Sequence, residues 1–253
     1  MSRRPLIAGN WKMHGTVAEC RSFLQALSAL PKEWERIDTA VFFPFTALFA
    51  VRGLAGGRVT IGAQNLYYEE KGAFTGEISP GMVREVADAV LIGHSERREL
   101  FHETDPMVAR KIRAALKHEL RPVVCVGETL AERDRGEAQA KIERQLEAAL
   151  AGLTPAEAEK LALAYEPIWA IGTGRNASPE QAQEIHGVIR RWLAAGGFPA
   201  ERMRILYGGS VKPDNSSLLL AQADIDGLLV GGASLQADSF SAIIDAALDR
   251  LIP

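Results

Sequence analysis

Short apolar segments alternate with longer amphipathic segments from one end of the chain to the other. The apolar segments have hydrophobic residues at consecutive positions, a pattern that is typical of parallel strands buried on both faces. The segments predicted to be strands are Leu6–Ala8, Thr39–Phe43, Val59–Gly62, Ala89–Ile92, Val123–Val126, Leu161–Ala164, Ile205–Tyr207 and Gly227–Val230.

The segments between the predicted strands have helical spacing. The clearest stripe, at positions i, i+3, i+4, i+7 and i+8, consists of Ile185, Val188, Ile189, Trp192 and Leu193. A hydroxyl residue followed three positions later by Glu or Gln marks a helix start. This signal is found at Thr16 with Glu19, at Thr154 with Pro155 and Glu157, and at Ser178 with Pro179 and Gln181.

About eight strand-and-helix units in a chain of 253 residues match the usual size of a (β/α)8 barrel. An open, doubly wound sheet would give the same alternation, and periodicity alone does not separate the two folds. Because no linker, low-complexity tract or break in composition divides the chain, residues 1–253 are expected to form a single domain of the α/β class.

The composition excludes several classes of partner. A hydrophobic content of 47%, a charged content of 24% and a net charge of -3 are ordinary for a globular protein, and they argue against nucleic acid or an anionic membrane as a partner. The most apolar stretch, Ala40–Val51, is too short to span a bilayer.

Of the two cysteines, Cys20 and Cys125, the second lies in an apolar run and is expected to be a buried thiol. A cytoplasmic protein is expected, since the apolar segment that follows Arg3 and Arg4, Leu6 to Ala8, is too short for a signal peptide.

Polar residues follow five of the apolar runs. Since barrel enzymes have their reactive groups at the carboxyl ends of strands, these residues are candidates for catalysis. A lone surface lysine, structural histidine, turn glutamate or glycine turn would each be unremarkable, but all of them at one rim predict an active site. The residues are Asn10 and Lys12, His94, Glu166, Gly208 to Ser210, and Gly231 with Gly232.

The glycine turns after the seventh and eighth runs predict a phosphate site. Without a Cβ, their backbone N–H groups can approach a phosphate closely. The segment from Pro167 to Gly174 is interpreted as a hinged lid, because a proline stiffens one end, Gly172 and Gly174 free the other, and the middle is apolar.

The chain resembles the triosephosphate isomerase family over essentially its whole length. The similarity rests on the order and spacing of Ala8–Met13, Gly62–Asn65, Gly72–Glu77, Ile92–Arg98, Cys125–Glu128, Ala164–Pro167, Trp169–Gly174, Tyr207–Ser210 and Gly231–Ser234. The resemblance implies a TIM barrel that interconverts dihydroxyacetone phosphate and D-glyceraldehyde 3-phosphate in glycolysis and gluconeogenesis, without a cofactor or a metal.

The resemblance also implies the roles of single residues. Glu166 would move the proton, His94 would hydrogen-bond the substrate oxygens, and Lys12 would add positive charge beside Asn10. The residues implied to hold the phosphate are Asn10, Lys12, Gly172, Ser210, Gly231 and Gly232.

The family is usually dimeric, so a homodimer is expected. The loop Gln64–Ser79 would insert into the partner, and Thr75 would reach the partner's site near Asn10 and Lys12. His14 stands where asparagine is usual, close to that contact, and the run 42–44 is bulkier than usual. Two alternatives stay open: another sugar-phosphate isomerase or epimerase, and an inactive barrel that only binds a phosphate ligand.

Overall fold

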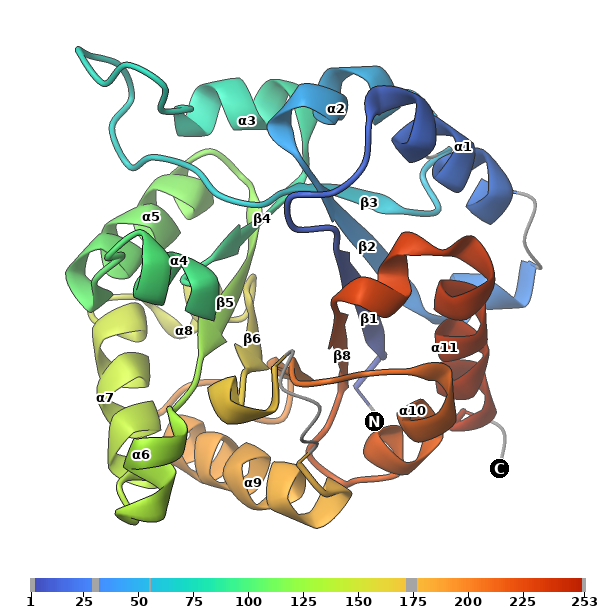
Figure 1. Ribbon diagram of the computed structural model, residues 1–253. Helices are drawn as coiled ribbons and strands as arrows, with labels where there is room; N and C mark the ends of the chain where they lie inside the picture. The colour runs from blue at the N-terminus through green and yellow to red at the C-terminus, as the bar shows by residue number, and fades with distance from the viewer. Residues whose placement is uncertain (1–2, 29–31, 55, 172–176, 252–253) are drawn as a thin grey trace.

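Eight parallel strands form a closed barrel surrounded by helices (Figure 1). The computed structural model describes residues 3–28, 32–54, 56–171 and 177–251. Closure comes from β1 and β8, which pair in parallel with Leu6 opposite Gly227. The fold is therefore a (β/α)8 barrel rather than an open sheet. The strands are β1 Leu6–Asn10, β2 Asp38–Phe43, β3 Thr60–Ala63, β4 Ala89–Ile92, β5 Arg121–Val126, β6 Ala162–Tyr165, β7 Arg204–Tyr207 and β8 Gly227–Val230.

All eight predicted strands are present; two have the predicted bounds, and the other six differ by one or two residues at one or both ends. The first strand extends to Asn10, because Asn10 still pairs with Phe42 of β2. Strand pairing of this kind depends on a neighbour distant in sequence, so the apolar run alone did not predict it. The consequence for the site is that Asn10 ends the strand itself.

Helices cover the outside of the barrel, and short helical turns follow several strands (Figure 1). The predicted stripe lies on α9, where all its members are buried except the half-buried Trp192. The elements are α1 Val17–Ser28, η1 Lys32–Arg36, α2 Phe45–Val51, α3 Pro80–Val86, α4 Ser95–Leu100, α5 Asp105–Lys117, α6 Leu130–Asp134, α7 Ala138–Leu150, α8 Pro155–Ala158, η2 Ile168–Ala170, α9 Pro179–Ala195, α10 Pro213–Leu220, η3 Gly232–Leu235 and α11 Ala237–Asp249.

The predicted helix starts are confirmed. Thr154 and Ser178 form capping boxes before α8 and α9. The hydroxyl of Thr16 accepts a hydrogen bond from the N–H of Glu19, whose carboxylate in turn accepts one from the N–H of Thr16. These hydrogen bonds satisfy N–H groups that a helix start leaves without partners.

The core has two layers, one inside the barrel and one between the strands and the helices. Cys125 lies in the inner layer and is fully buried, as predicted. The bulky Phe42 also points inside, against Gly62, where an added Cβ would lie 2.3 Å from its ring. Phe43 points outward and packs edge-on against Trp11. In the described part of the chain, no helix is long and apolar enough to cross a membrane.

Candidate active site

The carboxylate of Glu166 is buried directly after β6, with its side chain 1% exposed. Its Oε2 accepts a hydrogen bond of 2.9 Å from the backbone N–H of Ser95. Its Oε1 lies 2.9 Å from Nε2 of His94, yet it accepts no hydrogen bond from any residue that the structure describes. The two groups are thus at hydrogen-bond distance but are not aligned for a hydrogen bond.

Neighbouring groups keep Glu166 ionised. Burial alone would raise the pKa of this carboxyl, because it penalises the charged form. The imidazole of His94, the N–H of Ser95 and the ammonium of Lys12 outweigh burial and lower the pKa below its usual value. At neutral pH the side chain is therefore a carboxylate, the form that can act as a base.

His94 is the N-cap residue of α4, and the start of that helix fixes its ring. Its Nδ1 accepts a hydrogen bond of 3.3 Å from the N–H of Glu96, so the hydrogen of the neutral ring is on Nε2. Burial lowers the pKa of His94, but the carboxylates of Glu166 and Glu96 raise it and prevail in this arrangement. The hydrogen bond to Nδ1 opposes protonation, because Nδ1 can accept it only while unprotonated. Nε2 thus presents a donor next to Glu166.

Lys12 has a φ of 51°, in the left-handed region that residues other than glycine seldom adopt. Its N–H donates to Oδ1 of Asn10 at 3.0 Å, and its carbonyl accepts from Nε2 of Gln64 at 2.8 Å. These two contacts hold the unusual backbone conformation, a kind of strain that clusters at functional sites. The ammonium lies 2.6 Å from Oε1 of Glu96, so the positive charge is held next to the first turn of α4.

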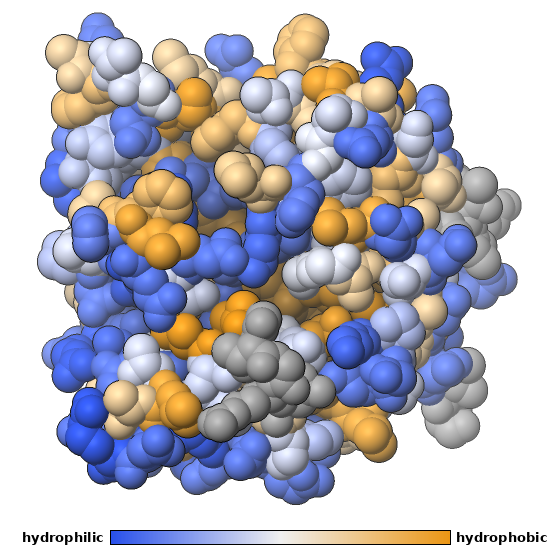
Figure 2. All heavy atoms as spheres, in the orientation of Figure 1, coloured by the Kyte–Doolittle hydropathy of each residue, from blue (hydrophilic) through white to orange (hydrophobic). Residues whose placement is uncertain are grey.

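A pocket of about 660 Å³ adjoins Lys12 at the loops after β7 and β8. Its walls include Ser210, Gly231 and Gly232. A Cβ added at Gly232 would meet no described atom within 4 Å, and one at Gly231 would meet Cε of Lys12 at 3.7 Å. A ligand can therefore approach this backbone closely. Figure 2 shows the same face of the molecule hollowed near its centre.

Glu166 fits into its site because two neighbouring residues are glycines without a Cβ. A Cβ at Gly127 would lie 1.9 Å from the carbonyl oxygen of Glu166, and one at Gly208 would lie 3.0 Å from its Cγ. A side chain at either position would displace the carboxylate. Gly208 was predicted from the sequence as part of a phosphate turn, and the structure gives it this second, packing reason.

The segment after Glu166 is tied to the end of β5 through Glu128. The Oε1 of Glu128 accepts hydrogen bonds of 2.9 Å from the hydroxyl of Tyr165 and from Nε1 of Trp169 on η2. Burial raises the pKa of Glu128. The described part of the predicted lid is thus anchored by the indole of Trp169. The rest of the lid, including the predicted phosphate ligand Gly172, lies outside the described residues.

The structure gathers the other predicted site residues at one end of the barrel. One pocket, of about 270 Å³, has Asn10, Lys12 and His94 in its walls, and Lys12 also lines the larger pocket. The residues brought together are Asn10, Lys12, His94, Glu166, Ser210, Gly231 and Gly232. In the described part of the chain, no three His, Cys, Asp or Glu side chains gather in a way that could hold a metal ion.

Sequence reasoning assigned no role to Glu96, Gln64 or Glu128, which support Lys12 and the lid. All three lie within the motifs that follow strands, so their positions in the sequence could have identified them as candidates. Their contacts could not be predicted in this way, because each contact joins segments from different strands of the barrel. Glu96 and Lys12 are 84 positions apart in sequence.

Comparison with known proteins agrees with this geometry. A family model described as triosephosphate isomerase matches residues 5–247. A triosephosphate isomerase of Carboxydothermus hydrogenoformans is 49% identical over 97% of this chain and 100% of its own. Those of Rubrobacter xylanophilus and Chloroflexus aurantiacus are each 53% identical, over 97% and 96% of this chain and 98% of their own.

Proposed function

The chain belongs to the triosephosphate isomerase family, and we propose that it interconverts dihydroxyacetone phosphate and D-glyceraldehyde 3-phosphate through an enediolate. The observation that supports this most is the ionised, buried Glu166, which has an unbonded carboxylate oxygen 2.9 Å from Nε2 of His94. A base, a neutral donor and a cation at one site are what proton transfer next to a carbonyl requires. In this proposal, residues 1–253 form a single domain.

Glu166 takes a proton from the carbon of dihydroxyacetone phosphate that bears the hydroxyl. The electron pair of that C–H bond forms the carbon–carbon double bond of the enediolate, and negative charge develops on the former carbonyl oxygen. The Nε2–H of His94 and the ammonium of Lys12 stabilise this oxygen. The proton of the other enediolate oxygen, which was the substrate hydroxyl, passes by way of Nε2 of His94 to the former carbonyl oxygen. Glu166 then returns its proton to the carbon that bears this new hydroxyl, and the electron pair left on the other oxygen forms the carbonyl of the aldehyde. Donors placed in advance are effective here, because they need no reorganisation as the charge appears.

Glu166 changes partners during this cycle. Its Oε2 is bonded to the N–H of Ser95, so we expect the carboxylate to leave that N–H when it reaches the substrate carbon. Loss of this hydrogen bond raises the basicity of the carboxylate. As the carboxylate moves away from His94, the influence that raises the pKa of the imidazole weakens, which favours a neutral donor.

The phosphate of the substrate occupies the pocket beside Ser210, Gly231 and Gly232, where backbone N–H groups and the charge of Lys12 can hold it. Gly172 joins this set on the strength of the family motif alone. Asn10 lines the neighbouring pocket and orients the backbone of Lys12.

A homodimer is part of the proposal. Two observations support it: the segment between β3 and α3, which contains Gln64–Ser79, projects beyond the helices (Figure 1), and apolar side chains are exposed near the site. Met13 is 95% exposed and Phe74 at the projecting loop is 41% exposed. Burial of these side chains against a second copy of the chain would remove their apolar surface from water. In the dimer, the partner's loop would cover Met13 and bring Thr75 close to Lys12.

A coupled assay with purified protein tests the reaction. The protein receives D-glyceraldehyde 3-phosphate without added metal or cofactor, and formation of dihydroxyacetone phosphate is followed. The proposal predicts turnover, and in D2O it predicts deuterium in the product, because a proton carried by Glu166 exchanges with solvent. A folded protein without turnover would contradict it and would leave the reading of an inactive phosphate-binding barrel.

A further inference from the structure

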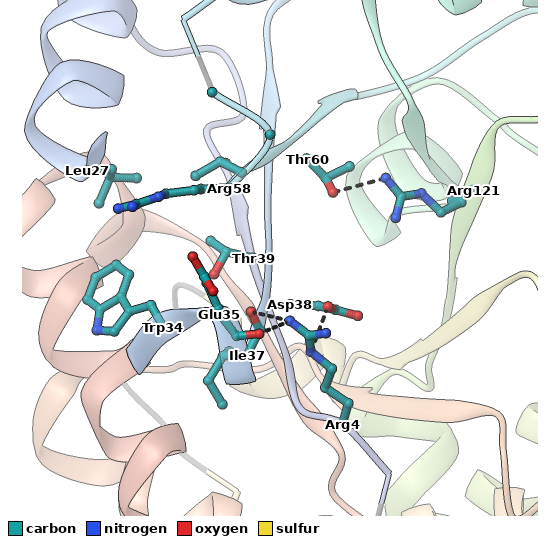
Figure 3. Close-up of a pocket in the computed structure, with 13 residues that line it drawn as sticks. Arg4, Leu27, Trp34, Glu35, Ile37, Asp38, Thr39, Arg58, Thr60 and Arg121 are labelled. Atoms are coloured by element: carbon teal, nitrogen blue, oxygen red, sulfur yellow. Dashed lines mark hydrogen bonds and ion pairs between the residues drawn. The ribbon is translucent and has the colours of Figure 1, made fainter. Parts of the chain in front are cut away.

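Another pocket lies at the opposite end of the barrel, where the strands begin (Figure 3). It has a volume of about 460 Å³ and is bordered by the starts of β2, β3 and β5. This volume lies within the range of about 300–1,000 Å³ that is usual for small-molecule sites. None of the residues proposed for catalysis lines it.

Charged side chains from separate segments meet in this pocket. Arg4, Arg58 and Arg121 line it together with the carboxylates of Asp38 and Glu35. Asp38 is neutralised twice, because Nε of Arg4 lies 2.9 Å from its Oδ1 and Nη1 of Arg204 lies 2.5 Å from its Oδ2 (Figure 3 draws the first of these contacts). Asp38 therefore contributes no net negative charge to the pocket.

The guanidinium of Arg121 has N–H donors that are available to a ligand. Arg121 begins β5, is exposed, and donates through Nη2 to the hydroxyl of Thr60 at 3.0 Å. In Figure 3 these two groups point toward each other. Among the described residues, no carboxylate lies within ion-pair distance of Arg121. Arg4, by contrast, also donates to the carbonyls of Glu35 and Ile37. The guanidinium of Arg121 can thus form a forked pair with an oxyanion.

Two aspartates at this end of the barrel are each held by two arginines, so each group of three has one positive charge in excess. The groups are Asp38 with Arg4 and Arg204, and Asp88 with Arg52 and Arg84. Such an arrangement favours an anion nearby.

We propose that this pocket binds a small organic phosphate. Its phosphate group lies against Arg121, where the hydroxyl of Thr60 is within reach. Its apolar part lies against Trp34 and Ile37, which line the other side. The guanidinium groups match the geometry of phosphate oxygens, and the apolar wall favours an organic rather than an inorganic anion. This site is independent of the catalytic proposal.

A substitution at Glu35 should change the binding affinity in the direction opposite to a substitution at Arg121. Its carboxylate lines the same pocket (Figure 3) and repels an anion. Glu35→Gln should therefore tighten binding, whereas Arg121→Gln should weaken it. Arg113→Gln is the matched control, because Arg113 is an exposed arginine on α5 whose guanidinium bonds the carbonyl of Ala151 rather than lining the pocket.

Phenyl phosphate serves as the probe, titrated at low salt while the backbone amide signals of Thr39 and Thr60 are followed by NMR. The amide of Ser210 reports binding at the catalytic end separately. We expect saturable shifts at Thr39 and Thr60 and affinity about tenfold weaker in Arg121→Gln, since one charge-assisted contact is lost. Glu35→Gln should bind more tightly, and Arg113→Gln should match the wild type.

The proposal is overturned if Thr39 and Thr60 do not shift, or if their shifts are the same in Arg121→Gln. It is also overturned if phenol, which lacks the phosphate, gives the same shifts at the same concentration. A shift confined to Ser210 would mean that only the catalytic end binds phosphate. A fold check by the dispersion of the amide spectrum keeps a loss of binding distinct from a loss of structure.

Discussion

At the catalytic end, neighbouring groups determine the ionisation of Glu166 and the backbone conformation of Lys12. Glu166 is ionised although buried, since His94, Ser95 and Lys12 together outweigh the effect of burial on its pKa. Lys12 is held in a left-handed conformation by two side-chain hydrogen bonds. The sequence predicted the residue types because each follows a strand, but it did not predict which atoms meet.

Lys12→Met should raise KM and lower kcat, because it removes the charge proposed to act on both the phosphate and the enediolate. The combined loss in kcat/KM should be about 100-fold or more. Lys141→Met is the matched control, since both lysine side chains are 26% exposed and each pairs with a glutamate. Steady-state kinetics of both variants check this prediction, and an unchanged kcat/KM in Lys12→Met would make Lys12 an ordinary surface charge.

At the scale of elements, the apolar runs located all eight strands, but not the closure of the sheet. Closure depends on pairing between Leu6 and Gly227, residues at opposite ends of the chain. Local periodicity has no information on such a contact, so an open sheet stayed possible until the family resemblance was considered. The three capping signals were reliable, because a cap depends only on neighbours in sequence.

The position of the lid depends on one hydrogen bond, between Trp169 and Glu128. Trp169→Phe keeps an aromatic ring but removes the N–H that Glu128 accepts at 2.9 Å. Leaving a buried acceptor without its hydrogen bond costs about 1–3 kcal/mol, so the lid should be held less well. We expect more enediolate to lose its phosphate, measured as inorganic phosphate released per turnover.

Trp192→Phe serves as the control for this substitution, since Trp192 lies on α9 and stacks on Phe198. It should leave the partition between isomerisation and phosphate loss unchanged. If Trp169→Phe behaved in the same way as Trp192→Phe, the anchoring role of the indole would be wrong.

For the whole molecule, buried His186 makes stability depend on pH. Burial lowers its pKa to about 4 in the folded state, whereas an unfolded histidine has a pKa of about 6.5. Between these values the unfolded chain binds a proton that the folded chain does not. The stabilisation is therefore complete above about pH 6.5 and is lost as the pH falls toward 4, a total of about 3 kcal/mol.

His186→Gln removes this titration and keeps a donor for the carbonyl of Asp224, which Nδ1 of His186 contacts at 3.1 Å. Urea unfolding at about pH 7 and about pH 5 should show a larger loss of unfolding free energy for the wild type than for the variant. Both proteins are compared at one concentration, because association also affects stability. Equal losses would show that His186 does not set the acid sensitivity.

Assembly is also a property of the whole molecule. Sedimentation of the wild type should give a dimer, and Met13→Lys should weaken it, because a charge would replace a side chain that is 95% exposed in the isolated chain and covered in the proposed dimer. Lys introduced at Leu218, which is 62% exposed on α10 at a distance from the projecting loop, is the control. A fully active wild-type monomer would contradict the dimer.

The most direct test of the account is the kinetics of Glu166→Gln beside the wild type in the coupled assay. The amide matches the carboxylate in shape but cannot accept the proton, so kcat should fall about 1,000-fold or more while the cooperative unfolding transition persists. Turnover close to that of the wild type in the folded variant would contradict the assignment of Glu166 as the base and, with it, the proposed mechanism.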